Sequence, residues 1–172
     1  TMNTLNSSLV PENDPYDLAC RLKGKCGVPK TVQGKQYKTG DKEKFWVLNS
    51  NTISYNLTSA TLLYVTPHTY FWAEDGIDVK QGDLKTLMDT FENKIYPTDR
   101  EFFGSEWTPG VDNDPHIFVL YTGRVGNIGG YFNSSDEFNP EITEHSNAHE
   151  SFVLASIQPL GGQYAYGTLA HE

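Results

Sequence analysis

The stretch His116-Ile117-Phe118-Val119-Leu120-Tyr121 decides the fold, because it is almost entirely apolar. A strand that is buried on both faces gives a continuous apolar run, whereas a half-exposed strand alternates polar and apolar residues. We therefore expect residues 116–121 to form the central strand of a sheet. Upstream, residues 45–48, 52–57, 60–65 and 68–73 are rich in β-branched and aromatic residues, with Asn and Ser turns between runs, and predict further strands.

A helix is expected between residues 68–73 and the central strand. Asp83 is a suitable N-cap, and Pro97 is expected to end the helix because proline breaks the backbone hydrogen-bond ladder. Apolar residues recur between them at helical spacing and form one stripe, which we interpret as core: Leu84, Leu87, Met88, Phe91 and Ile95. This helix would pack against one face of the sheet.

Two more strands and a second helix complete the pattern. Residues 128–132 predict an edge strand, in which Gly129 and Gly130 allow close approach by another backbone or mark a bulge. Residues 151–156 predict another strand, and Gly161-Gly162 leads into the last helix. The expected order is strand, helix, strand, edge strand, strand, helix. We predict an α+β fold with a twisted mixed sheet and a backing helix.

The last helix ends in His171-Glu172, which matches the first half of the zinc-binding pattern His-Glu-x-x-His. In the full pattern two histidines four residues apart share one helix face and reach one Zn²⁺, while the glutamate acts as general base. His171 is therefore a candidate metal ligand and Glu172 a candidate catalytic base. A second Ala-His-Glu occurs at residues 148–150, but Val153 stands four residues after His149, so that copy cannot complete the pattern.

Composition restricts the partners and the compartment. Thirteen Lys and Arg against 22 Asp and Glu give a formal charge of −9, which argues against nucleic acid and anionic membranes as partners. No apolar run approaches the roughly 18 residues that a membrane-spanning helix needs. Cys20 and Cys26 enclose a short basic loop. We favour a disulfide between them, made in an oxidising compartment, over free thiols or half of a metal site.

The chain divides near residue 43. Residues 1–43 are polar and proline-containing, and we expect an irregular N-terminal arm that is a remnant of a pro-segment. Residues 44–172 hold all the predicted strands and both helices, so we expect them to form one domain.

Taken as a set, several stretches make residues from about 66 to 172 resemble secreted bacterial zinc metalloendopeptidases of the immune inhibitor A and hyicolysin-like kind. The matching stretches are residues 70–76, 95–104, 112–117, 129–132, 146–150 and 167–172. The resemblance implies a zincin-like N-terminal catalytic subdomain that hydrolyses protein or peptide substrates, with Zn²⁺ as cofactor and secretion as its destination. It assigns His171 as first metal ligand and Glu172 as base, and Gly129, Gly130 and Tyr131 as a strand that pairs with substrate.

The second histidine, the third ligand and the C-terminal subdomain of such an enzyme do not occur within residues 1–172. We therefore expect a chain that is truncated within the motif, depends on a missing C-terminal subdomain and is inactive alone. Two alternatives stay open at this point: a non-catalytic extracellular β-rich binding module, and a pseudo-peptidase that keeps the fold without activity.

Two other polar clusters allow a metal. His145 and His149 are four apart and would share a face on a helix, but the intervening Ser-Asn and the strand after them favour a loop. Asp112-Asn113-Asp114 offers hard oxygens that could bind Ca²⁺. No glutamate occupies the twelfth loop position, and Pro115 follows directly, so we favour a simple Asx-turn there.

Overall fold

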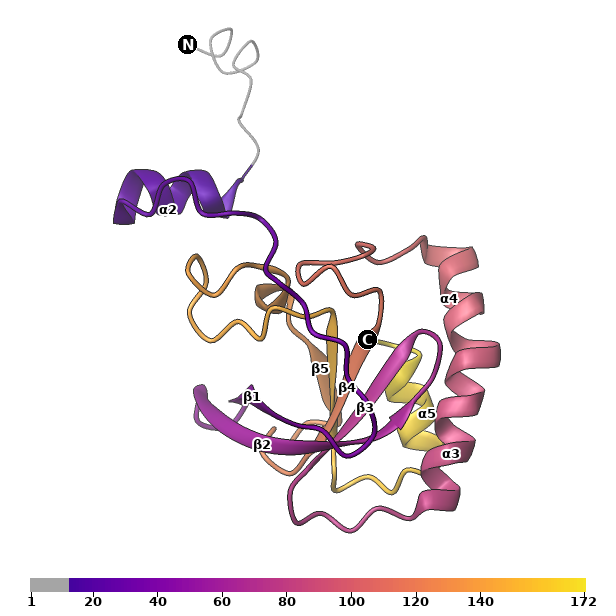
Figure 1. Ribbon diagram of the computed structural model, residues 1–172. Coiled ribbons are helices and arrows are strands. Elements are labelled where there is room, and N and C mark those ends of the chain that lie inside the picture. The colour runs from indigo at the N-terminus through magenta and orange to yellow at the C-terminus, as the bar shows by residue number, and fades with distance from the viewer. Residues whose placement is uncertain (1–12) are drawn as a thin grey trace, which may run out of the picture.

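One six-stranded mixed sheet organises the structure, a computed structural model that describes residues 13–172 (Figure 1). The strands lie in the order β1-β2-β3-β4-β6-β5, with β3, β4 and β6 parallel and the other pairs antiparallel. Their bounds are β1 Lys42–Asn49, β2 Ser54–Val65, β3 Thr69–Glu74, β4 Ile117–Thr122, β5 Gly130–Phe132 and β6 Ser151–Ala155. The mixed sheet with helices confirms the predicted α+β class.

Strand β4 lies inside the sheet between β3 and β6, and all six of its residues are buried. The apolar run therefore predicted the central strand correctly. Strand β5 pairs only with β6 and lies at the edge, as the glycine-containing sequence predicted. The expected turn between residues 52–57 and 60–65 is wrong, because both runs belong to the single strand β2. That strand changes register only between Leu62 and Tyr64.

Helical residues between β3 and β4 form one long rod: α3 (Gln81–Thr90), the π-helical turn η1 (Phe91–Ile95) and α4 (Tyr96–Phe103). The prediction that Pro97 ends the helix is wrong. Pro97 lies in the first turn of α4, and the wide turn of η1 just before it rearranges the hydrogen-bond ladder that proline would otherwise break. The expected N-cap is also wrong, since Lys80 holds that position and Asp83 lies in the first turn.

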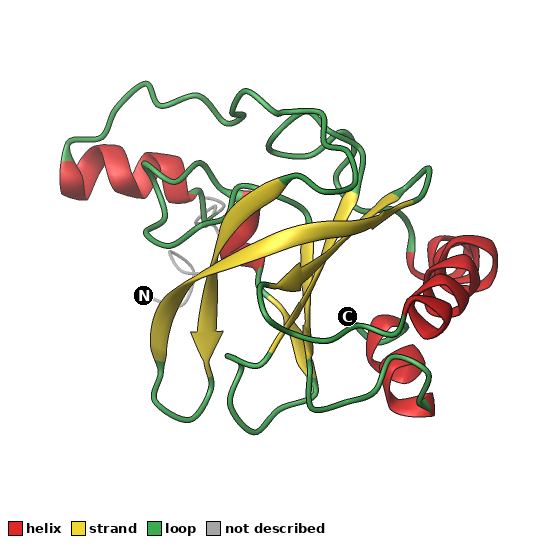
Figure 2. Ribbon diagram, turned by 60° about the horizontal axis from the view of Figure 1, so that its bottom comes forward, coloured by secondary structure: helices red, strands yellow, loops and turns green. Residues whose placement is uncertain are grey.

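Each face of the sheet has its own core. Figure 2 shows the rod and α5 (Gln163–Leu169) together on one side of the sheet. The first core lies between the sheet and these helices and includes Leu84, Leu87, Met88 and Phe91, which confirms these four residues of the predicted stripe as core; the fifth, Ile95, is half-buried and packs against it. The second core contains Phe45, Val47, Leu62, Trp72, Phe118 and Val153, where β1 and β2 curl over the opposite face. Large buried residues on both faces of β3 and β4 hold the two layers together.

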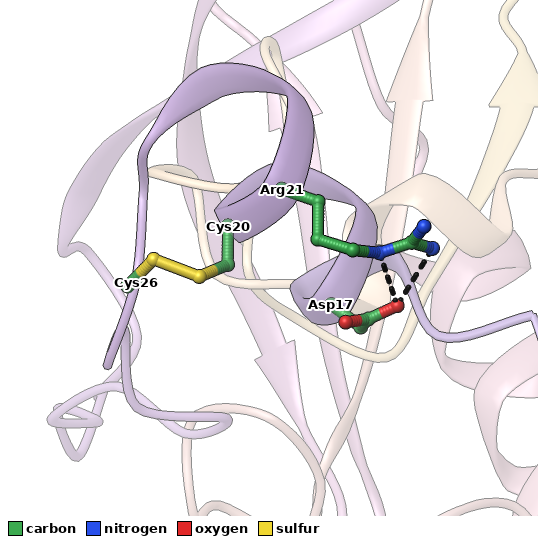
Figure 3. Close-up of a disulfide and its surroundings, with 4 residues drawn as sticks. All are labelled: Asp17, Cys20, Arg21 and Cys26. Atoms are coloured by element: carbon green, nitrogen blue, oxygen red, sulfur yellow. Dashed lines mark hydrogen bonds and ion pairs between the residues drawn. A yellow bond between two sulfur atoms is a disulfide. The ribbon is translucent and has the colours of Figure 1, made fainter.

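The N-terminal segment contains a helix that the sequence did not predict. Helix α2 (Pro15–Lys23) starts at Asp14, whose side chain accepts a hydrogen bond from the backbone N–H of Tyr16. A disulfide joins Cys20 to Cys26 and confirms the favoured pairing (Figure 3). Figure 1 shows α2 standing apart from the sheet. The predicted arm, residues 1–43, is therefore not wholly irregular, since its described part, residues 13–43, contains α2. Residues 1–12 lie outside the described part.

No helix within residues 13–172 is both long enough and apolar enough to cross a membrane.

Candidate functional site

Helix α5 brings the two motif residues to the edge of the sheet. It follows β6, and its buried residues Ala165 and Leu169 pack on the core. The backbone N–H groups of His171 and Glu172 both donate to the carbonyl of Thr168, at 3.0 and 3.1 Å, so the two residues form a turn directly after α5. The motif residues are therefore held by the helix.

The Glu172 carboxylate contacts the edge strand directly. Its Oε2 accepts a hydrogen bond of 2.9 Å from the backbone N–H of Phe132 in β5. That N–H is available because β5 pairs with β6 on one side only. A carboxylate and an imidazole thus lie beside backbone groups that an extended peptide could use.

Two clefts border the motif residues. The main cleft, of about 610 Å³, lies among α4, β5 and the end of α5, and its lining includes Phe103, Phe132, Glu137, Glu150, Phe152 and His171. A second cleft, of about 690 Å³, is lined by Gly129, Gly130, Gln163, Tyr164, Gly167 and Thr168. His171 and Glu172 line both clefts, so the predicted site residues border hollow surface beside β5.

Carboxylates dominate the main cleft. Asp99, Glu106, Glu137, Glu150 and Glu172 line it, and Arg100 is its one Lys or Arg residue. Glu150 is only 7% exposed. Burial and the nearby Glu137 carboxylate raise the pKa of Glu150 to about 8, because both disfavour its ionised form. The cleft therefore holds a carboxyl group that is largely protonated at neutral pH when nothing is bound.

The three residues predicted to pair with substrate, Gly129, Gly130 and Tyr131, lie in different environments. A Cβ on Gly130 would lie 2.5 Å from the Val153 carbonyl oxygen and 2.7 Å from Thr168 Cγ2, so this glycine permits close approach of β6 and α5. Gly129 is similarly close to Gln158. The Tyr131 side chain packs against the second core, and its hydroxyl accepts a hydrogen bond from Leu48 N–H at 2.9 Å. Tyr131 thus contributes packing, while its backbone stays on the edge strand.

The second Ala-His-Glu sequence lies in a loop, as predicted, and its histidine is part of the packing. His149 Nδ1 lies 2.7 Å from Asp112 Oδ2, and its ring stacks on Phe118 with centroids 3.8 Å apart. His145 stacks on Tyr55 instead, with centroids 4.5 Å apart. These two histidines have separate partners, so the helical metal pair that their spacing allowed does not form.

The Asp112-Asn113-Asp114 segment forms the expected Asx-turn, in which Asp114 N–H donates to Asp112 Oδ1 at 3.1 Å. The Asp112 carboxylate pairs with His149, and the Asp114 carboxylate pairs with His116. Their oxygens therefore have protein partners, which supports a structural role for this segment.

The set of zinc ligands that the motif implies is incomplete among the described residues. Among residues 13–172, no group of three or more His, Cys, Asp and Glu side chains is placed to hold a metal ion. His171 supplies one imidazole, whereas a catalytic zinc takes three protein ligands and a water. The described residues do not form a zinc site on their own.

Sequence reasoning missed the cluster of Glu106, Glu137 and Glu150. These residues come from three separate segments: the loop after α4, the 3₁₀ turn η2 (Ser134–Glu137) and the residue before β6. Only tertiary structure brings them together, and no local spacing signals it. The charge of −9 was the one available hint.

No protein-family model and no curated protein sequence matches this chain.

Proposed function

We propose that this chain is the N-terminal part of a secreted zinc-dependent metalloendopeptidase, with a zincin-like arrangement of sheet, backing helix and active-site helix. One observation carries the proposal: α5 delivers His171 and Glu172 to clefts beside the edge strand, with Glu172 2.9 Å from Phe132 N. The zinc pattern begins with an adjacent His and Glu on a helix, and these two residues directly follow the end of α5 and its C-cap Ala170.

Substrate would bind as an extended peptide along β5. An edge strand offers unpaired backbone groups to an added strand, and Phe132 N–H is such a group, because the end of α5 contacts it rather than a neighbouring strand. A peptide backbone that replaces Glu172 at this N–H would free the carboxylate and place a scissile carbonyl close to it. The second cleft, beside Gly129 and Gly130, would then accommodate residues on one side of the cleaved bond.

In the proposed enzyme His171 Nε2 or Nδ1 would be the first metal ligand, and the other ligands would come from residues after Glu172. A bound zinc would polarise the carbonyl and lower the pKa of water. Glu172 Oε would accept the proton of the attacking water and pass it to the leaving amine nitrogen. Accepting the proton and passing it on both need a carboxylate held near the peptide, and Glu172, which directly follows α5, would supply it.

The proposal predicts that the 172-residue chain alone neither binds zinc tightly nor cleaves peptides, because one imidazole is a weak site. Isothermal titration with Zn²⁺ and a fluorogenic peptide assay measure both properties. The coding sequence gives the complementary test, since the pattern requires histidine at the third codon after Glu172. Any other residue there, or tight zinc binding and proteolysis by the chain alone, would refute the assignment.

The second candidate is a non-catalytic extracellular binding module or a pseudo-peptidase. Exposed aromatic side chains favour it: Phe102 is 74% exposed, Phe103 86% and Trp107 45%. Such residues bind proteins or glycans in many extracellular modules. A stop codon directly after Glu172, together with saturable binding to a glycan array, would select this candidate over the peptidase.

A further inference from the structure

The main cleft combines aromatic sides with carboxyl groups, one of them buried. Phe132 and Phe152 line it as an edge-to-face pair with ring centroids 6.4 Å apart. Phe103 lies at the exposed rim, with 86% of its surface accessible. Glu150 lies on the buried side, 7% exposed, beside Glu137. An elongated apolar group with a charged tip would suit this combination.

The negative charge in the main cleft is not balanced. Arg100 pairs with Glu106, Nη1 to Oε1 at 3.5 Å, and also donates to the Tyr96 hydroxyl. Neither Glu137 nor Glu150 forms an ion pair with any residue in the range 13–172. Five carboxyl groups of this cleft thus face one guanidinium, and even with Glu150 protonated the acidic groups outnumber Arg100.

Glu150 also has an unused oxygen. Its Oε1 is buried and has no hydrogen-bond partner among the described residues. Buried polar atoms are almost always paired, so an unpaired one in a cleft points to a ligand that donates to it. The ligand must be a hydrogen-bond donor, and the surrounding carboxylates favour one with positive charge.

We propose that the main cleft is a subsite for the guanidinium or ammonium side chain of a peptide substrate, which Glu150 and Glu137 bind at its buried end. The methylene stem of Arg or Lys would lie along the surface that the phenylalanine rings form, and the cation could also interact with a ring face. The inference rests on the proposed function, because His171 and Glu172 line the same cleft and would place this side chain next to the scissile bond.

A metal ion is the less suitable occupant. Ca²⁺ takes six to eight oxygen ligands. The described residues gather no group of three side chains that could hold a metal. The phenylalanines would give a hydrated metal no ligands, whereas they suit the stem of a long basic side chain. A basic side chain has an apolar stem and a positively charged tip, which matches a cleft that is both apolar and acidic.

The test compares two probes with blocked, uncharged termini, Nα-acetyl-arginine methylamide and Nα-acetyl-citrulline methylamide. Their side chains are nearly isosteric, but only the arginine side chain is charged. Binding to the 172-residue chain is measured by two-dimensional amide NMR titration. We expect the arginine probe to bind at least about tenfold tighter, with shifts at Glu150 and Phe152. Glu150→Gln should remove that preference, and Glu137→Gln should reduce it. Glu144→Gln, in an exposed loop with its side chain 88% accessible, is the matched control and should preserve it.

Three results would overturn the subsite: equal binding of both probes, a preference that survives both Glu150→Gln and Glu137→Gln, or displacement of the arginine probe by 1 mM CaCl₂. Unfolding curves of each variant show whether it is folded. Because the probes need no zinc and no cleavage, this result is independent of the proposed peptidase activity. Peptide cleavage by the full-length protein without preference for Arg or Lys would refute only the proposed subsite. Absence of cleavage with intact probe binding would refute only the proposed peptidase activity.

Discussion

Replacing Glu150 by Gln should stabilise the chain at alkaline pH and change its stability little at acidic pH. The carboxyl group is 7% exposed and lies beside Glu137, so ionisation inside the folded chain is costly. The Gln amide has nearly the same shape and can donate a hydrogen bond to the neighbouring Glu137 carboxylate. Because the amide cannot ionise, the folded variant does not bear the free-energy cost of a charged carboxylate at this buried position.

The sign follows from proton binding. The pKa of Glu150 rises from 4.5 to about 8 on folding, so between these pH values the folded chain keeps a proton that the unfolded chain loses. The free energy of unfolding therefore falls as pH rises through this range and levels off above pH 8. A full shift of this size corresponds to roughly 5 kcal/mol. Water in the open cleft lowers the realistic figure to about 2 kcal/mol.

Urea unfolding at pH 5 and pH 9, followed by tryptophan fluorescence, measures this effect. We expect Glu150→Gln to equal the unsubstituted chain within about 0.5 kcal/mol at pH 5, and to exceed it by about 2 kcal/mol at pH 9. Glu144→Gln, on the surface, should show no such change between the two pH values. A Glu150→Gln difference that is the same at both pH values would refute the buried environment of this residue beside Glu137.

Two further predictions concern the scaffold. Gly130→Ala should lower stability by about 1–3 kcal/mol in urea unfolding, because its Cβ would lie 2.5 Å from the Val153 carbonyl oxygen. Gly82→Ala in α3, where nothing lies within 4 Å, should instead be neutral or stabilising, and equal losses at both sites would contradict the close packing of β5. Reducing the Cys20–Cys26 disulfide should destabilise α2 by up to about 2 kcal/mol, seen as faster amide exchange in α2. Equally accelerated exchange in β4 would show that α2 and the sheet unfold together.

The sequence predicted those features that depend on local patterning. The apolar run of β4 and the stripe from Leu84 to Phe91 each reflect burial of one element, and burial leaves a direct mark on residue type. The glycines before Tyr131 predicted an edge strand for a similar reason, because the missing side chains allow close packing.

Features that depend on tertiary context were not predictable in this way. Local rules predicted that Pro97 would end the helix, but the π-helical turn before it allows the helical backbone to continue. The acidic cleft needed Glu106, Glu137 and Glu150 to meet from three segments. His171 and Glu172 were proposed as site residues from a local motif, whereas the contact between Glu172 and β5 is a property of the whole fold and had no local signal.

The most direct measurement of the central claim is the zinc content and peptide-cleavage rate of the full-length gene product, with and without Glu172→Gln. We expect about one zinc per chain in both proteins, because the role proposed for Glu172 is that of a base and not a ligand. We also expect a loss of about 100-fold or more in cleavage by the variant. A full-length protein without stoichiometric zinc, or a Gln variant that cleaves as fast as the parent, would contradict it.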